Sequence, residues 1–334
     1  MKSKTSLDFD DLSSKLIKSV DEYISIPLIH VVNLSLASGI VPNPMKFTTV
    51  IPIFKSGNVN TFSNYRPISI LPVVSKLLEK VVANKFAKFI NDTNQYYEHQ
   101  YGFRAGHSTI HPIIHLLNRV AQENDTKDKK LTMAVFLDLS KSFDTINHDI
   151  LLTKFDRMGI RGTAKKWFES YLSDRRQCTF THGTMSTLNL IHYGVSEGSI
   201  LGPILFLLYI NDIGRATTLP VLSFADDTTV SVSSASVEYL YTRMNTELIA
   251  LSQWFMSKKL CLNALKTKYV IFRPFSNKRI PVNRQIVING QIIERISNNS
   301  SCKSFKFLGV HIDLCPGSFM LIIYAKKLFA EKGN

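Results

Sequence analysis

Three aspartates stand where strand-like apolar segments end. Asp226 and Asp227 are adjacent inside Val-Leu-Ser-Phe-Ala-Asp-Asp-Thr-Thr-Val, a stretch with the pattern of a β-hairpin. Asp138 ends another such run, Met-Ala-Val-Phe-Leu-Asp. Charge at the end of a buried strand is unfavourable unless something pairs with it, and carboxylate oxygens suit Mg²⁺. Because two such ions can bind a triphosphate and an attacking hydroxyl together, the three acids indicate nucleotidyl transfer.

Each acid also has a simpler interpretation. Asp138 could cap the turn that follows it, and Asp226 with Asp227 could form a solvated hairpin tip. Taken singly, each motif favours this interpretation, because acids at turns are common. Their joint placement favours the metal site instead.

The composition restricts the class of partner. The chain has 334 residues, of which 45% are hydrophobic and 20% charged, so it can bury a core and is not disordered overall. Lys and Arg number 40 against 26 Asp and Glu, giving a net charge of +14. Such an excess favours polyanionic partners, with nucleic acid first and an anionic membrane surface second.

The cysteines and the N-terminal sequence indicate the cellular compartment of the protein. Cys178, Cys261, Cys302 and Cys315 form no Cys-x-x-Cys pair, which disfavours zinc fingers and a disulfide framework. The first ten residues contain no apolar signal-peptide segment, and the longest apolar run, 200–210, is too short to span a bilayer. We expect an intracellular protein of the cytoplasm and nucleus, with no membrane partner.

The elements that must position the acids follow from the periodicity of apolar residues. We expect helices at 10–38, 75–91, 108–122, 147–158, 162–173, 199–212 and 236–258. We expect strands at 48–55, 132–138, 177–181, 187–192, 268–273, 285–289 and 305–312, besides the aspartate hairpin. Helices and strands mix without strict alternation, which predicts an α+β fold.

Several ordered motifs carry a family resemblance. Three surround the acids: Asp-Leu-Ser-Lys-Ser-Phe-Asp at 138–144, Gly-Val-Ser-Glu-Gly-Ser-Ile-Leu-Gly-Pro-Ile-Leu-Phe at 194–206 with Tyr-Ile-Asn-Asp at 209–212, and Phe-Ala-Asp-Asp at 224–227. Others are Asn-Tyr-Arg-Pro-Ile-Ser at 64–69 with 75–80, Gln-Tyr-Gly-Phe-Arg at 100–104 with 107–109, and Phe-Lys-Phe-Leu-Gly-Val at 305–310. Over residues 29–313 the chain resembles the reverse transcriptases of non-LTR retrotransposons, most closely the jockey type.

The resemblance implies a right-hand polymerase with fingers and palm, which copies an RNA template onto a DNA primer with two Mg²⁺ ions and dNTP substrates. Asp138, Asp226 and Asp227 match the family's metal-binding aspartates. Phe143 matches the aromatic gate that excludes a ribose 2′-hydroxyl, although alone it would pass for a core phenylalanine.

Basic and glycine-containing segments complete the implied site. Lys55 and Arg66 match cations near the incoming triphosphate, and either alone could be a solvated loop charge. Gly198 is expected to lie in a tight loop, residues 194–198, whose backbone would approach the template and nucleotide. At Glu197 the chain departs from the family, which has glutamine there. A carboxylate so close to phosphates would repel them, so we expect it to weaken catalysis.

Two further segments complete the resemblance. Lys266 matches the general acid for pyrophosphate, with solvent exposure an equal alternative, and Phe307-Leu308-Gly309 matches the primer grip. The block at 100–109, with Arg104 and His107, would contact the template backbone.

The resemblance also sets the expected domain boundaries. They are an N-terminal helical extension at 1–45, fingers and palm at 46–313, and a divergent truncated tail at 314–334. On this basis we expect the thumb to be missing or incomplete, and the chain to be a fragment without its endonuclease. The alternative is a catalytically impaired, nucleic-acid-binding remnant. A metal-dependent nuclease or phosphatase ranks third, because it would leave Phe143 unexplained.

Overall fold

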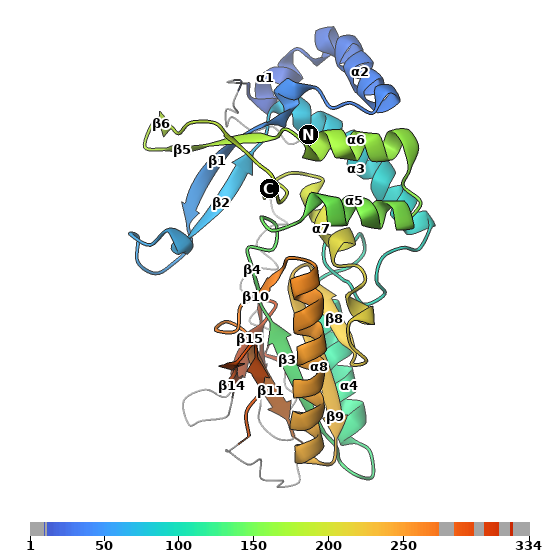
Figure 1. Ribbon diagram of the computed structural model, residues 1–334, viewed down its shortest axis with the longest axis vertical. Coiled ribbons are helices and arrows are strands. Elements are labelled where there is room, and N and C mark those ends of the chain that lie inside the picture. Colours follow the sequence, from blue (N-terminus) through green and yellow to red (C-terminus); the bar gives the residue numbers. More distant parts are fainter. Residues whose placement is uncertain (1–9, 11, 274–283, 297–303, 314–320, 323–334) are drawn as a thin grey trace. The chain divides into compact units, whose positions relative to one another are not determined.

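Two compact units make up the computed structural model, which describes residues 10, 12–273, 284–296, 304–313 and 321–322 (Figure 1). The first unit comprises residues 1–96 and 141–211, and the second comprises 97–140 and 212–334. Each unit therefore combines two separate stretches of chain. None of the helices in the described ranges has the length and apolar character needed to cross a membrane.

The first unit packs helices against a small sheet. Its helices are α1 (Ser14–Ser19), α2 (Asp21–Ser38), α3 (Val73–Asp92), α5 (His148–Arg157), α6 (Gly162–Leu172) and α7 (Gly202–Tyr209), with 3-10 turns η1 (Asn43–Lys46) and η2 (Phe62–Asn64). Its strands are β1 (Phe47–Phe54), β2 (Tyr65–Ile70), β5 (Arg176–Thr181), β6 (Thr184–Met185) and β7 (Asn189–Leu190). Strand β1 lies between an antiparallel β2 and a parallel β5. In the core, the Phe86 ring contacts the rings of Phe155 and Phe168.

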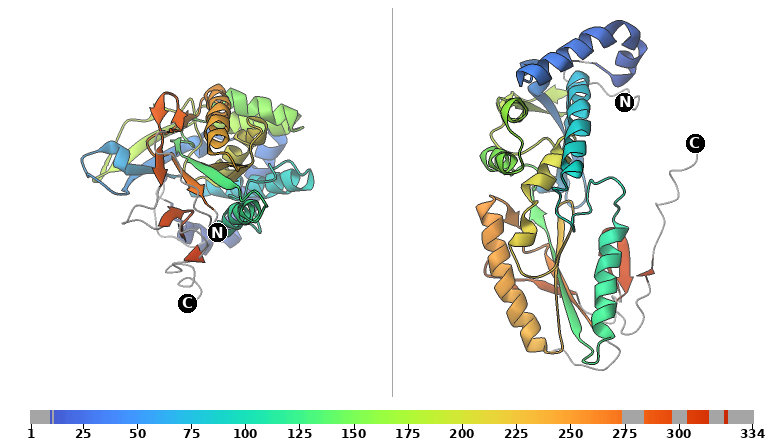
Figure 2. Two further views of the ribbon diagram at one scale, coloured as in Figure 1. Left: turned by 90° about the horizontal axis from the view of Figure 1, so that it is seen from below. Right: turned by 90° about the vertical axis from the view of Figure 1, so that its right-hand side faces the viewer.

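The second unit is a sheet with a helix on each face. Its main strands are β3 (Leu131–Leu137), β8 (Val221–Phe224), β9 (Asp227–Ser234), β11 (Lys268–Phe272) and β14 (Glu294–Ile296), in the order β14-β11-β3-β9-β8. Helices α4 (Ile110–Asn124) and α8 (Val237–Ser257) cover opposite faces (Figure 2, right). The shorter elements are β4 (Leu139–Ser140), η3 (Ile213–Arg215), β10 (Cys261–Leu262), β12 (Val287–Ile288), β13 (Gln291–Ile292), β15 (Ser304–Phe307), β16 (Val310–Asp313) and β17 (Leu321–Ile322).

The sequence of β3 explains its central place. Nearly every residue of Leu-Thr-Met-Ala-Val-Phe-Leu is buried, as expected for a strand covered on both faces. Helix α8 buries Leu240, Met244, Leu248 and Leu251, whose spacing gives one apolar stripe. The second unit therefore fixes the end of β3, where Asp138 follows, within a continuous core.

The predicted mixture of helices and strands is confirmed, with four local corrections. Residues 10–38 form two helices, which meet at Val20. The predicted helix at 199–212 begins only at Gly202, because the Ser199 hydroxyl accepts the Gly202 N–H at 2.9 Å in a preceding turn. Residues 187–192 contain only β7, and 305–312 form the hairpin β15–β16 rather than one strand.

Candidate active site

The acidic pair lies at the tip of the β8–β9 hairpin. Phe224 pairs with Asp227, so Ala225 and Asp226 form a two-residue turn. Tight hairpin turns of this length need a positive φ at the first central residue, and Ala225 has a φ of 57°. A residue with a side chain is strained in that region, so contacts outside the hairpin must hold the turn.

Gln100 and Gly102, which we call the turn clasp, supply those contacts. The buried Gln100 side chain accepts the Ala225 N–H at 2.9 Å and donates to the Ala225 carbonyl at 3.2 Å. Its Oε1 atom also accepts the Gly102 N–H at 2.8 Å. A Cβ atom on Gly102 would lie 2.1 Å from the Ala225 nitrogen, so only glycine fits. The clasp therefore sets the position of the acidic turn.

Asp138 reaches the same end of the sheet from β3. Leu137 pairs with Thr228 of β9, which places Asp138 beside the start of that strand. The main chain of Asp138 is fixed on its other side by Asn263 and Thr267. The Asn263 N–H donates to the Asp138 carbonyl at 2.8 Å, and the Asp138 N–H donates to Thr267 Oγ1 at 3.2 Å.

The three carboxylates influence one another electrostatically. Partial removal from water raises the pKa of Asp227 to about 6, and the charges of Asp226 and Asp138 add to this effect. Hard oxygen donors that repel one another in this way suit divalent cations such as Mg²⁺. Among the described residues, no three His, Cys, Asp or Glu side chains are gathered closely enough to hold a metal ion as they stand. The donor chemistry thus fits the ion, while the side chains would have to converge on it.

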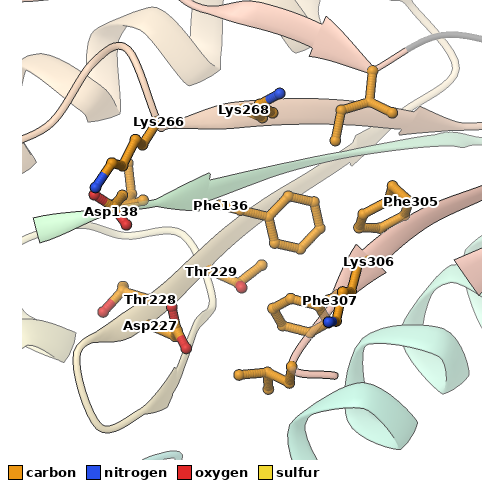
Figure 3. A pocket seen from close by; sticks show the side chains of 13 residues that line it. Phe136, Asp138, Asp227, Thr228, Thr229, Lys266, Lys268, Phe305, Lys306 and Phe307 are labelled. Atoms are coloured by element: carbon orange, nitrogen blue, oxygen red, sulfur yellow. The ribbon is translucent and has the colours of Figure 1, made fainter. Parts of the chain in front are cut away.

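A cavity of about 280 Å³ opens beside Asp138 and Asp227 (Figure 3). Figure 3 shows the exposed Lys266 side chain directed toward Asp138. Lys268 and Lys306 also line the cavity, and Lys268 forms an ion pair with Glu294 at 2.8 Å. The cavity therefore presents both charge signs, as a site for a metal-bound anion requires.

Aromatic rings form the other wall of this cavity. Phe136 of β3 lies 5.1 Å from Phe305 and 4.7 Å from Phe307, measured between ring centroids. Leu308 and Gly309 make the β15–β16 turn with φ values of 48° and 85°. The segment predicted to be a primer grip thus packs beside the strand that leads to Asp138.

The predicted triphosphate cations belong to the first unit. Lys55 directly follows β1, and its exposed side chain lies where the loop of the β1–β2 hairpin begins. Arg66 lies in β2, opposite Ile53. Its Nε atom forms an ion pair with Glu197 Oε1 at 3.1 Å.

Gly198 lies in the loop that carries Glu197. Its φ is 114°, and a Cβ atom there would stand 2.7 Å from the Ser69 carbonyl oxygen. Glycine is therefore required for both backbone conformation and space.

Phe143 also belongs to the first unit and is half-buried. Its ring stacks on Phe206 of α7, with centroids 5.0 Å apart and planes 29° from parallel. The Phe143 carbonyl accepts the Val195 N–H at 2.9 Å. Packing therefore fixes one ring face and leaves part of the ring accessible.

Sequence reasoning missed the residues that support these groups. The 100–109 block is predicted to contact the template backbone, and within it the Gln100 side chain is hydrogen-bonded to the hairpin turn. Arg104 likewise donates to the carbonyls of Tyr97 and Gln100, at 3.3 and 2.9 Å. The buried Glu79 accepts the Ile200 N–H at 2.7 Å at the end of the loop that carries Glu197. An acid on the apolar face of a predicted helix was the available signal for Glu79.

Comparison with known proteins identifies the family of this chain. The family model described as reverse transcriptase (RNA-dependent DNA polymerase) matches residues 53–312. The probable RNA-directed DNA polymerase from transposon BS of Drosophila melanogaster is 28% identical over 320 residues, covering 93% of this chain and 34% of that protein. The RNA-directed DNA polymerase from the mobile element jockey of the same species is 26% identical, covering 91% of this chain and 33% of the relative.

A more distant relative shares the same region. The Pol polyprotein from the type-1 retrotransposable element R2 of Popillia japonica is 25% identical over 294 residues, covering 83% of this chain. The chain spans about a third of the length of the Drosophila melanogaster relatives. The comparisons therefore concern only the portion of each relative that aligns with this chain.

Proposed function

Because the chain belongs to the reverse transcriptase (RNA-dependent DNA polymerase) family, we propose that it extends a DNA 3′-end on an RNA template by adding dNTPs. The observation that carries the proposal is the meeting of Asp138, Asp226 and Asp227 at one end of one sheet, where the pKa of Asp227 is raised to about 6. Partly desolvated, mutually repelling acids of this kind are typical of sites that bind cations. Within residues 46–313, the part in the second unit is the proposed palm, and the part in the first is the proposed fingers.

Two Mg²⁺ ions are the proposed cofactors, held by Asp138 and Asp226 with support from Asp227. When bound, such ions lower the pKa of a primer 3′-hydroxyl and neutralise charge on the leaving pyrophosphate. The turn clasp fixes the backbone of the acidic turn, so that only the carboxylate side chains would have to converge on the ions.

The remaining residues act on the nucleotide. Lys55 and Arg66 bind the triphosphate through charge-assisted hydrogen bonds. Phe143 excludes a 2′-hydroxyl by its bulk and so selects dNTPs. Lys266 lies beside Asp138 in the cavity and donates a proton to pyrophosphate as it leaves.

The proposed domain limits are those expected from the family resemblance of the sequence. Residues 46–313 form fingers and palm, and 1–45 form an N-terminal extension that includes α1 and α2. Most of the predicted tail at 314–334 lies outside the described residues. The alternative of a non-catalytic remnant is not favoured, because the relatives are named as polymerases.

A primer-extension assay on an RNA template tests this function. The variants Asp138→Asn and Asp226→Asn keep side-chain volume but remove a charge, and we expect each to lower dNTP incorporation by at least about a thousandfold. The matched control is Asp125→Asn, which removes the same charge from an exposed position after α4. Equal incorporation by Asp226→Asn and the wild type would refute the proposal.

A further inference from the structure

We infer that Glu197 is a built-in competitor for Arg66, which an incoming triphosphate must displace before it can use this cation. The inference rests on the proposed function, which makes Arg66 a triphosphate-binding residue. Its direct support is the 3.1 Å ion pair between Arg66 Nε and Glu197 Oε1. The carboxylate therefore acts through a defined partner, in addition to repelling phosphates at a distance.

The backbone holds Glu197 against the strand that carries Arg66. The Ser69 N–H donates to the Glu197 carbonyl at 2.7 Å. The next residue, Gly198, approaches the Ser69 carbonyl so closely that a side chain would not fit. Since Ser69 and Arg66 both lie in β2, these contacts hold the Glu197 backbone beside that strand, and only the Glu197 side chain has to turn for the ion pair to open.

The loop is also fixed at its two ends. At the first end, the Gly194 N–H donates to the Ile146 carbonyl at 2.7 Å, and His148 Nε2 donates to the Gly194 carbonyl at 2.8 Å. At the other end, the 1% exposed Glu79 accepts the Ile200 N–H and the Tyr171 hydroxyl, each at 2.7 Å. The 194–201 loop therefore presents Glu197 to Arg66 before any ligand is bound.

The ion pair is nevertheless weak enough to open. The Arg66 and Glu197 side chains are 58% and 30% exposed, and exposed pairs contribute little because water and salt screen them. A triphosphate carries several negative charges and can form a bidentate contact with a guanidinium. It can therefore replace Glu197, although at reduced net affinity.

Lys55 offers a contrast within the same unit. Among the described residues, no ion pair to its exposed side chain is found. A triphosphate can thus meet Lys55 without displacing a carboxylate. Arg66 is the cation whose use is restricted, and Glu197 sets that restriction.

Isothermal titration of the full chain with inorganic tripolyphosphate tests the inference without requiring catalysis. We expect Glu197→Gln to tighten binding about fivefold, because it frees Arg66 while keeping the side-chain shape. The matched control, Glu169→Gln, removes the same charge from exposed α6 and should leave binding unchanged. In an Arg66→Gln background, the gain from Glu197→Gln should fall below about twofold.

Two results would overturn the inference: no gain from Glu197→Gln, or an equal gain with and without Arg66. If thermal melting shows that Arg66→Gln does not fold, Arg66→Met replaces it. Methionine keeps an unbranched apolar stem but has no charge to pair with Glu197, so the gain from Glu197→Gln should again shrink.

Primer extension separates this inference from the proposed function. A wild-type chain without extension would refute the function, while the tripolyphosphate titrations would still report on the ion pair. Active extension with an unchanged dNTP KM and unchanged tripolyphosphate binding in Glu197→Gln would refute the inference alone. We expect the KM for dNTP to fall in this variant, with kcat nearly constant.

Discussion

The two units hold their charged residues in different ways. In the second unit, buried hydrogen bonds from Gln100 and a close backbone approach by Gly102 fix the acidic turn. In the first unit, Arg66 lies on a strand and is held by an exposed ion pair with Glu197. The first arrangement is rigid, and the second can exchange its partner.

This difference follows from the magnitudes of the interactions. Leaving a buried hydrogen-bonding group unsatisfied costs about 1–3 kcal/mol, whereas an exposed ion pair contributes about 0–1 kcal/mol. The buried contacts hold the backbone that carries the acids, whereas the exposed ion pair can open when another anion binds Arg66. The contrast therefore assigns a preorganised backbone to the acids and competition to Arg66.

The largest expected effect comes from breaking the turn clasp with Gly102→Val. The added side chain would collide with the Ala225 nitrogen, so the acidic turn must move. We expect loss of measurable primer extension and a fall in the free energy of unfolding of about 3 kcal/mol. Extension assays and urea unfolding measure the two quantities.

A milder variant keeps this prediction testable if Gly102→Val fails to fold. Gln100→Met preserves volume but leaves the Ala225 N–H and carbonyl unpaired, so extension should fall about tenfold in a folded protein. Gln122→Met, the same change at an exposed position of α4, should behave as wild type. Full activity in Gln100→Met would show that the turn needs no clasp.

An intermediate effect is expected at Phe143 in the first unit. Phe143→Ala removes the ring that packs on Phe206, so a ribose 2′-hydroxyl could be accommodated. We expect the ratio of kcat/KM for dNTP over rNTP to fall about a hundredfold, mostly because rNTPs are accepted. Steady-state kinetics with both nucleotides measures this ratio.

The control for Phe143 is Tyr23→Ala, which removes an 82% exposed aromatic ring from α2 of the same unit. It should leave discrimination unchanged. If Phe143→Ala keeps the wild-type ratio, Phe143 is a packing residue and the proposed gate lies elsewhere.

The smallest expected effect is the pH dependence of folding stability that the ionisation of Asp227 causes. Its pKa is raised from 3.8 to about 6, so the folded state binds the proton more tightly than the unfolded state. The free energy of unfolding should therefore decrease as pH rises through this window. Asp227→Asn should raise Tm near neutral pH and leave it unchanged below about pH 4.

The solvent exposure of Asp227 limits the gain in stability expected from Asp227→Asn. Because the Asp227 side chain reaches solvent, we expect less than about 1 kcal/mol. Thermal melts without Mg²⁺, with Asp125→Asn as control, measure it. A Tm gain that is the same at both pH values would contradict a raised pKa. Primer extension by the wild type should show the opposite trend and fall below about pH 6, because metal binding needs the ionised carboxylate.

Local patterns predicted the parts of the fold that depend on neighbouring residues. The apolar run ending at Asp138 and the hairpin around Asp226 are strands in the structure, and they bring the acids to one end of a sheet. Their catalytic roles stay predictions. The strand expected at 305–312 was wrong because Leu308 and Gly309 adopt positive φ values and reverse the chain.

Contacts between distant segments could not be predicted from the sequence. Gln100 meets Ala225, and Arg66 meets Glu197, through tertiary pairing that no local periodicity encodes. Glu197 was recognised as a departure from the family motif, and repulsion of phosphates was the expected consequence. Only the fold reveals that a specific cation lies beside it.

The order of the strands has a consequence for synthesis on the ribosome. Strand β3 lies between β11 and β9, and both follow it in the chain after the whole 141–211 segment of the first unit. At typical translation rates, about ten seconds separate the emergence of β3 from that of β9. During this interval the apolar Leu131–Leu137 run has neither of its neighbouring strands, so it is open to non-native association. The sheet that carries the acids can therefore close only after residues 141–211 of the first unit have been made.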